Sequence, residues 1–204
     1  MMYYHQKQTA GFSMVEMLVS ISILLLVIVG PMTITVRTAK SATFASEQVQ
    51  AFFFAQEGLE LAQKGRDDLL LRRFLPTSHA NYLANPWAAF ISTAGTYSLC
   101  YNSNGCGLEW SEINSNQLDT VVNCGSPVDT CLLKRDTSAT NARSTFTYST
   151  VNSVNTIYTR RIYFTKLGDD SAVQVRSVVS WRTGSLIAEQ QVVVETYLYN
   201  IYAP

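Results

Sequence analysis

Residues 7–36 read KQTAGFSMVEMLVSISILLLVIVGPMTITV, and this stretch decides the fold. The 20 residues from Met17 to Val36 contain no charged side chain. As a helix rising 1.5 Å per residue they would span ~30 Å, the thickness of the hydrocarbon core of a bilayer. A buried helix of a soluble protein is the alternative. A secretory signal peptide fits less well, because its apolar region covers about 7 to 15 residues and ends at a small-x-small cleavage site. We therefore predict a transmembrane helix.

The charges flanking this span give a weak indication of its orientation. The short segment before it carries one firm positive charge, Lys7, and is expected to stay in the cytoplasm. Arg37 and Lys40 on the other flank weaken that inference, because basic residues normally mark the cytoplasmic side.

The overall composition argues against several classes of protein. The 204 residues contain 15 Lys+Arg and 15 Asp+Glu, so the net charge gives no reason to expect a bound nucleic acid. His5 and His79 are the only histidines, which leaves little material for a metal site or for histidine-based catalysis. The sequence contains no nucleophile elbow, P-loop or dinucleotide-binding glycine pattern. We expect no enzymatic activity, no cofactor and no metal.

Glu16 is the only ionisable residue between Lys7 and Arg37, and it lies at the edge of the apolar run. A carboxylate carried toward the bilayer centre costs up to ~2.5 to 3.5 kcal/mol, so it needs a cationic partner. That partner could be a lipid headgroup, a cation on another subunit, or a new amino terminus made by proteolysis upstream. Gly11-Phe12 offers a small residue before a bulky one, and a cut there would place a free amine four residues before Glu16.

The segment KQTAG followed by FSMVEMLVSISIL resembles the class III leader and N-terminal helix of type IV prepilins and pseudopilins. The resemblance implies that a prepilin peptidase cuts after Gly11 and methylates the new terminus, Phe12. It also implies that Glu16, the fifth residue of the mature chain, is needed for methylation and assembly. The implied partners are the peptidase, other pilin subunits in a helical filament, and the assembly platform in the inner membrane.

Self-assembly gives this arrangement a physical reason. The Glu16 carboxylate of one subunit can neutralise the Phe12 amine of a neighbour, so that a charge costly in lipid directs docking. The alternative is that Glu16 pairs with Phe12 of its own helix, since residues i and i+4 are neighbours on one face.

Gly30-Pro31 is predicted to be a weak point of the helix, because proline removes a helical hydrogen bond. Pilins often carry such a proline about two residues later, so Pro31 departs from the family pattern. The helix could stretch or unwind here during packing, and an ordinary kink of a membrane helix is the alternative.

The helix is predicted to continue beyond the span, because no proline occurs from Met32 to Leu75. Apolar residues recur there at a spacing of three or four, namely Phe44, Ala51, Phe54, Ala55, Leu59 and Ala62. A helix from Phe12 to about Arg66 would be roughly 80 Å long. Some bending is expected at Gly58 and Gly65, and Pro76 is expected to end the helical region.

A second resemblance covers a different part of this helix. Ala55-x-Glu57-Gly58-x-Glu60 with Arg66-Asp67 resembles the AxEGxExxxxxRD pattern of PilV-like minor pilins. The alternative is that these charged residues form only a solvated helix face.

Residues 76 to about 135 are rich in Asn, Ser, Gly and Pro and contain all four cysteines, Cys100, Cys106, Cys124 and Cys131. Beyond a membrane span, an even number of cysteines in a loop-rich segment favours two disulfides. Three pairings are possible, and closure between nearest neighbours is preferred. Free buried thiols are one alternative, and a zinc site is a less favoured one because its paired ligands usually lie two to four residues apart.

The C-terminal part of the sequence changes to a period of two, which indicates strands. Val173 to Trp181 and Gln190 to Leu198 each place apolar residues on one face, with a turn at Arg182 to Ser185. Ile157 to Leu167 supplies a third strand, and the Ser/Thr/Asn-rich residues 137–156 are expected to form an exposed loop or edge. The aromatic residues of these strands are expected to pack in the core and on the sheet rather than to bind a ligand.

Together these observations predict a pilin-like α+β fold with a long N-terminal helix, half of it transmembrane. This helix would pack on a C-terminal antiparallel sheet of about three to five strands with a disulfide-rich loop. The expected regions are a leader (1–11), a transmembrane or filament-core helix (12–36), an amphipathic extension (37–75) and an exported β domain (76–204). The implied function is that of a minor type IV pilin, first in the cytoplasmic membrane and then in a surface filament used for adhesion, motility or DNA uptake. The alternatives are a pseudopilin of a type II secretion system and a permanently anchored surface-binding protein.

Overall fold

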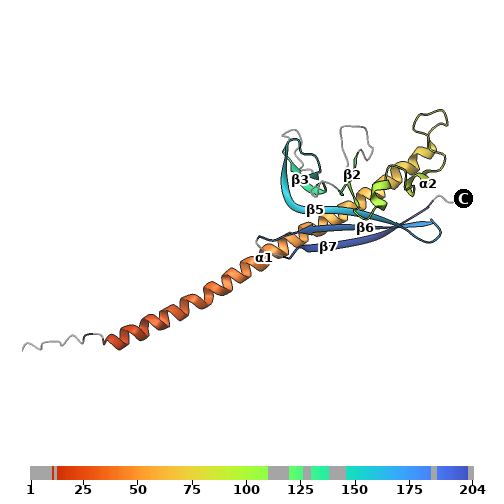
Figure 1. Ribbon diagram of the computed structural model, residues 1–204. Coiled ribbons are helices and arrows are strands. Elements are labelled where there is room, and N and C mark those ends of the chain that lie inside the picture. Colours follow the sequence, from red (N-terminus) through yellow and green to blue (C-terminus); the bar gives the residue numbers. More distant parts are fainter. Residues whose placement is uncertain are drawn as a thin grey trace, which may run out of the picture. The chain divides into compact units, whose positions relative to one another are not determined.

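The computed structural model describes residues 11, 13–109, 120–125, 130–137, 146–184 and 188–201 (Figure 1). The chain forms two compact units, Met1–Ser46 and Glu47–Pro204, and each is described by itself. The helices are α1 (Met14–Leu71), the 3-10 turn η1 (Arg72–Phe74), α2 (Pro86–Phe90) and the 3-10 turn η2 (Ser98–Tyr101). The strands are β1 (Cys106–Glu109), β2 (Thr120–Asn123), β3 (Leu132–Asp136), β4 (Phe146–Thr147), β5 (Ser153–Lys166), β6 (Ala172–Trp181) and β7 (Gln190–Tyr199).

In the first unit, α1 is an unbroken helix from Met14 onward. It runs through Pro31, although proline donates no backbone hydrogen bond. The hydroxyls of Thr33 and Thr35 donate to the carbonyls of Gly30 and Pro31, at 2.8 and 2.9 Å, and so bond to the same turn. The loosening of the helix at Gly30-Pro31 during packing stays a prediction.

The second unit is built around a seven-stranded sheet in which every pair is antiparallel. The central strand β5 pairs along one edge with β6, which in turn pairs with β7. Along its other edge β5 pairs with β3 near its beginning and with β1 at Ile162. The expected β6–β7 hairpin and the third strand are confirmed, but the sheet has more strands than the three to five that we expected.

The extra strands β1, β2 and β3 lie in the segment that the sequence marked as a disulfide-rich loop, and β4 lies in residues 137–156, which were expected to form an exposed loop or edge. The disulfide-rich segment contains α2, η2, β1, β2 and β3, so describing it as a loop was wrong. The disulfides are Cys100–Cys106 and Cys124–Cys131, the nearest-neighbour pairing. The first joins η2 to β1, and the second joins the end of β2 to the start of β3, so each fixes the entry to a short strand.

The part of α1 that belongs to the second unit lies along one face of this sheet (Figure 1). Its buried side is made mostly of small residues, namely Ala51, Ala55, Gly58, Ala62 and Gly65. A Cβ atom on Gly58 would lie 2.5 Å from the Ser177 hydroxyl, and one on Gly65 would lie 2.9 Å from Cζ of Tyr97. These glycines let the sheet and Tyr97 approach the helix closely, whereas bending of the helix at them stays a prediction.

The core lies between this side of α1 and the inward face of the sheet. Fully buried members include Phe90, the Cys100–Cys106 disulfide, Leu108, Ile162, Val173 and Val175. Helix α2 begins at Pro86 after Asn85, whose side chain accepts a hydrogen bond from the Ala88 amide at 3.1 Å, as N-cap residues do. The helical region ends at Phe74, two residues before Pro76, as a following proline requires.

Candidate assembly site

Glu16 lies in the first turn of α1, with its side chain exposed. The helix takes its first backbone bond from the Met17 amide to the Ser13 carbonyl, at 3.2 Å. The carboxylate therefore lies near the positive end of the helix dipole, which stabilises a negative charge by about 0.3 to 1 kcal/mol at an exposed site. Phe12, the predicted partner of Glu16, lies outside the described residues. Gly11, the other half of the predicted cleavage site, is described and exposed, and a Cβ there would meet nothing within 4 Å.

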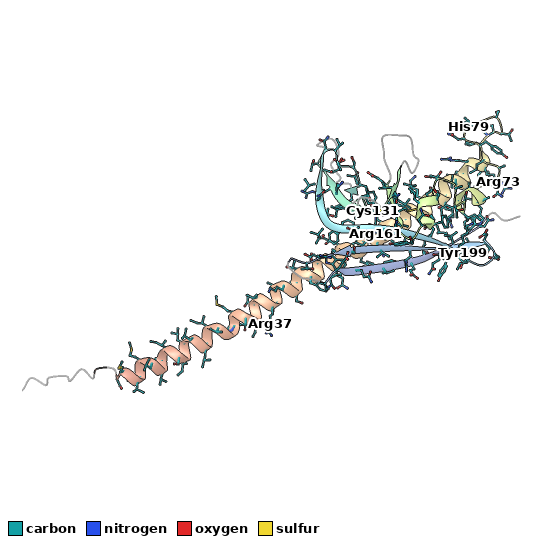
Figure 2. All side chains as sticks on the ribbon, in the orientation of Figure 1. Arg37, Arg73, His79, Cys131, Arg161 and Tyr199 are labelled. Carbon is teal, nitrogen blue, oxygen red and sulfur yellow. A yellow bond between two sulfur atoms is a disulfide. The ribbon has the colours of Figure 1, made fainter. Side chains whose placement is uncertain are left out.

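The helix that follows Glu16 is apolar on all sides. Large hydrophobic side chains from Met17 to Val36 are exposed by about half or more in the isolated chain. A helix that is hydrophobic all round belongs in a membrane or in the interior of a larger assembly. Among the described residues, Met14–Phe74 is the one helix long and apolar enough to cross a membrane. Figure 2 shows its side chains, with Arg37 just beyond the apolar run.

Comparison with protein families gave one match, the prokaryotic N-terminal methylation motif, over residues 6–30. The match contains Gly11, Phe12 and Glu16 and extends to Gly30. It indicates a type IV prepilin or pseudopilin. Comparisons with curated proteins and with solved structures gave no match.

The match has two direct implications. Its methylation motif implies processing by a prepilin peptidase, and its apolar helix indicates a protein anchored in the inner membrane. Proteins of this family are structural rather than enzymatic. The described residues contain no group of three or more His, Cys, Asp or Glu side chains that could hold a metal ion.

A second polar site, which the sequence reasoning missed, joins α1 to the sheet in the exported unit. The side chain of Arg160 on β5 is 1% exposed and points toward the helix. Its guanidinium donates to the Glu57 carboxylate at 2.8 Å and to the Phe54 carbonyl at 3.3 Å, both on α1. It also donates to the Tyr148 hydroxyl at 2.9 Å and to the Leu108 carbonyl on β1 at 3.1 Å. One side chain thus ties together the helix, β5, β1 and the segment after β4.

The electrostatics of this site keep Arg160 charged. Burial opposes the charged form, but the nearby Tyr148 and Glu57 outweigh it and hold the pKa of Arg160 above its ordinary value. Burial likewise raises the pKa of the Tyr148 hydroxyl, so Tyr148 stays neutral. The Glu57 side chain is 42% exposed, so water can still reach the carboxylate.

The helical pattern Ala55-x-Glu57-Gly58 therefore has a structural role rather than forming only a solvated face. Ala55 and Gly58 are buried against the sheet, and Glu57 accepts from Arg160. Arg66 is 8% exposed and forms an ion pair with Asp67 at 2.7 Å. Glu60 is exposed, in agreement with the solvated reading.

Proposed function

We propose that the chain is a minor type IV pilin, cut between Gly11 and Phe12, methylated at Phe12 and built into a surface filament. The observation that carries this proposal is the methylation motif running directly into a helix whose apolar side chains have no cover in the single chain. Leaving the membrane would expose this surface to water, unless other subunits cover it. A filament with helices at its centre supplies that cover through open-ended, head-to-tail contacts.

Glu16 is the residue proposed to fix the axial position of each new subunit against its neighbour in the filament. Its carboxylate would pair with the Phe12 amine of a neighbour inside the apolar bundle, where an unpaired charge costs several kcal/mol. An intramolecular pair with Phe12 of the same helix would neutralise the charge without guiding assembly. Gly30-Pro31 would let the helix lengthen locally as subunits pack.

The minor role is supported by the exported domain rather than by the helix. Its AxEGxExxxxxRD segment resembles that of PilV-like minor pilins, and its Glu57 and Gly58 contact the sheet. A domain with two disulfides and a seven-stranded sheet suits an initiating, tip or modifying subunit exposed outside the cell.

The test uses Glu16→Ala and Glu16→Gln in the producing cells, with Ser22→Ala as a control on the same helix. The Ser22 hydroxyl bonds only to the Leu18 carbonyl of its own helix in the structure, so its loss should not affect assembly. Both Glu16 variants should be expressed and cut normally. Their amount in sheared filaments should fall about tenfold or more, which corresponds to a loss of 1.4 kcal/mol or more per docking event.

Mass spectrometry of the membrane-extracted chain gives the complementary reading. A methylated Phe12 terminus supports the proposal, and Gly11→Val should abolish cleavage by crowding the peptidase pocket. An intact Met1 terminus in the wild-type chain would instead identify a permanently anchored surface protein. Normal incorporation of both Glu16 variants would refute the pairing mechanism.

A further inference from the structure

The free edge of β7 is the longest open strand edge in the described part of the sheet. Strands β2 and β4, the two ends of the path β2-β1-β5-β3-β4, have four and two residues, whereas β7 has ten. It pairs with β6 through ten successive residue pairs without a register shift. Native edge strands are usually short, bulged, or guarded by proline or lysine. The sequence QQVVVETYLY of β7 contains no proline or lysine, and Glu195 is its one charged residue.

The backbone of β7 presents a regular row of hydrogen-bonding groups along this edge. The Asn200 amide donates to the Ser171 carbonyl at 3.1 Å, which makes this a hydrogen-bonded pair of the antiparallel ladder. Such pairs alternate along a ladder. The amides and carbonyls that face away from β6 therefore belong to Gln191, Val193, Glu195, Tyr197 and Tyr199.

The side chains of the same five residues lie on the sheet face opposite α1. Val193, Tyr197 and Tyr199 are 45%, 48% and 56% exposed. Figure 2 labels Tyr199 on this strand. Exposed tyrosines beside an apolar side chain are typical of the centre of a protein interface.

Glu195 supplies the only charge of the strand. It forms no ion pair with another described residue, and its carboxylate accepts one hydrogen bond, from the Gln174 side chain at 3.0 Å. Arg176 lies directly opposite on β6, but its guanidinium lies over the Tyr163 ring, 5.0 Å from the centroid. The carboxylate is therefore available to a cation from outside the chain.

We propose that this edge binds an extended segment of a partner protein by strand addition, with a lysine or arginine of the partner opposite Glu195. Main-chain hydrogen bonds would hold the segment, and the side chains of Val193 and Tyr197 would favour β-branched or aromatic residues two positions to either side of the cation. A second copy of the chain is a poorer occupant, because β7 contains no lysine or arginine to place opposite Glu195. This site lies in the exported unit and does not depend on Glu16.

The test is a peptide array probed with the full chain in detergent micelles. Each nine-residue peptide alternates threonine and valine around a central Lys, Arg, Gln or Glu. The chain should bind Lys- and Arg-centred peptides about threefold to tenfold more strongly than Glu-centred peptides, because opposite charges directly across two strands attract and like charges repel. Glu195→Lys should reverse this preference without altering the backbone.

Two variants at one position separate strand addition from a general affinity of the surface. Val193→Pro removes an outward amide at a place where an edge strand tolerates proline, and it should abolish binding of every peptide. Val193→Thr keeps the amide and should bind within twofold of the wild-type chain. Tryptophan fluorescence checks that the proline variant is folded.

Three results would overturn the proposal. The first is that the chain binds no peptide, and the second is that Glu195→Lys leaves the peptide preference unchanged. The third is that the full chain self-associates and Val193→Pro abolishes this self-association, because a second copy of the chain would then be the occupant. Normal filament incorporation of a chain that binds no peptide would reject this site and leave the proposed pilin function intact.

Discussion

Arg160→Met should lower the free energy of unfolding of the exported unit by about 2 to 6 kcal/mol. Methionine fills much of the space, so the loss comes from the hydrogen bonds rather than from a cavity. The Tyr148 hydroxyl and the Leu108 carbonyl would each lose a buried donor, at about 1 to 3 kcal/mol apiece. The Phe54 carbonyl lies inside a helix and keeps its helical bond, so it adds little.

The ion pair itself should contribute less than these buried bonds. Glu57 is 42% exposed, and water can solvate its carboxylate once the guanidinium is gone. Glu57→Gln keeps an acceptor for Arg160 but removes the counter-charge of a guanidinium that is 1% exposed, so it should cost about 1 to 2 kcal/mol, less than Arg160→Met. A double-mutant cycle of the two substitutions should therefore give a coupling energy well below the cost of Arg160→Met alone.

The measurement is urea unfolding of the full oxidised chain in detergent micelles, followed by tryptophan fluorescence. Trp87 and Trp181 are 6% and 3% exposed in the folded unit, so their emission reports its opening. A lower midpoint with an unchanged slope would show a loss of stability rather than a change of the unfolded state.

Arg161→Met is the matched control, because Arg161 is the next residue on β5 and points to the other face of the sheet. It forms no ion pair with another described residue, and its buried Nε has no hydrogen-bond partner, so its replacement breaks no bond and should lower stability by no more than about 0.5 kcal/mol. Equal effects of the two arginine substitutions would refute the view that Arg160 fastens the helix to the sheet. A cost of Glu57→Gln equal to that of Arg160→Met would show that the charge, and not the buried hydrogen bonds, dominates.

Three further changes test other parts of the exported unit. Gly65→Ala should cost about 1 to 3 kcal/mol in the same urea assay, because the new methyl group would meet the Tyr97 ring, whereas Gly30→Ala meets nothing within 4 Å and should cost nothing. Replacing both cysteines of the Cys100–Cys106 disulfide with serine should cost about 2 to 3 kcal/mol, and reductant should then lower the midpoint of this variant less than that of the wild type. Burial raises the pKa of Tyr97 to about 12, so the folded state holds its proton above pH 10 while the unfolded chain releases it. The free energy of unfolding should therefore not depend on Tyr97 below pH 10 and should fall by up to about 1.4 kcal/mol per pH unit between pH 10 and 12. A urea midpoint that stays constant between pH 10 and 12 would contradict this prediction.

The N-terminal helix and the closing hairpin could be predicted because each carries its own periodic pattern. The run from Met17 to Val36 has no charge, and Val173 to Trp181 alternates apolar and polar residues. These patterns are local, so no knowledge of the partner element is needed to recognise them.

The short strands β1 and β3 could not be predicted in the same way. Their sequences, CGLE and LLKRD, show no clear alternation and lie among turn residues. They are strands because β5 offers them an edge and because the two disulfides hold their ends. Such pairing depends on residues far away in the chain, and a local pattern does not contain it.

Arg160 was missed because two adjacent arginines give no local sign that one of them is buried. The available signal was its phase: Tyr158, Arg160, Ile162 and Phe164 alternate along β5, and all four are buried. An arginine in step with the apolar residues of a strand must find acceptors in the core. Glu57, which lies beside the small buried residues of α1, is such an acceptor.

The spacing of Ala55, Glu57 and Gly58 follows from this one buried cation. The Arg160 side chain passes 3.3 Å from the position that a Cβ of Gly58 would occupy, on its way to Glu57 and the Phe54 carbonyl. A larger residue at position 58 would push the guanidinium away from the helix, and a neutral residue at position 57 would leave it without a counter-charge. Helix and sheet therefore constrain each other through a glycine that gives room and an acid that receives the charge. This dependence explains why Glu57 and Gly58 are adjacent in the sequence: the glycine leaves space for the Arg160 side chain, and the glutamate accepts its hydrogen bond.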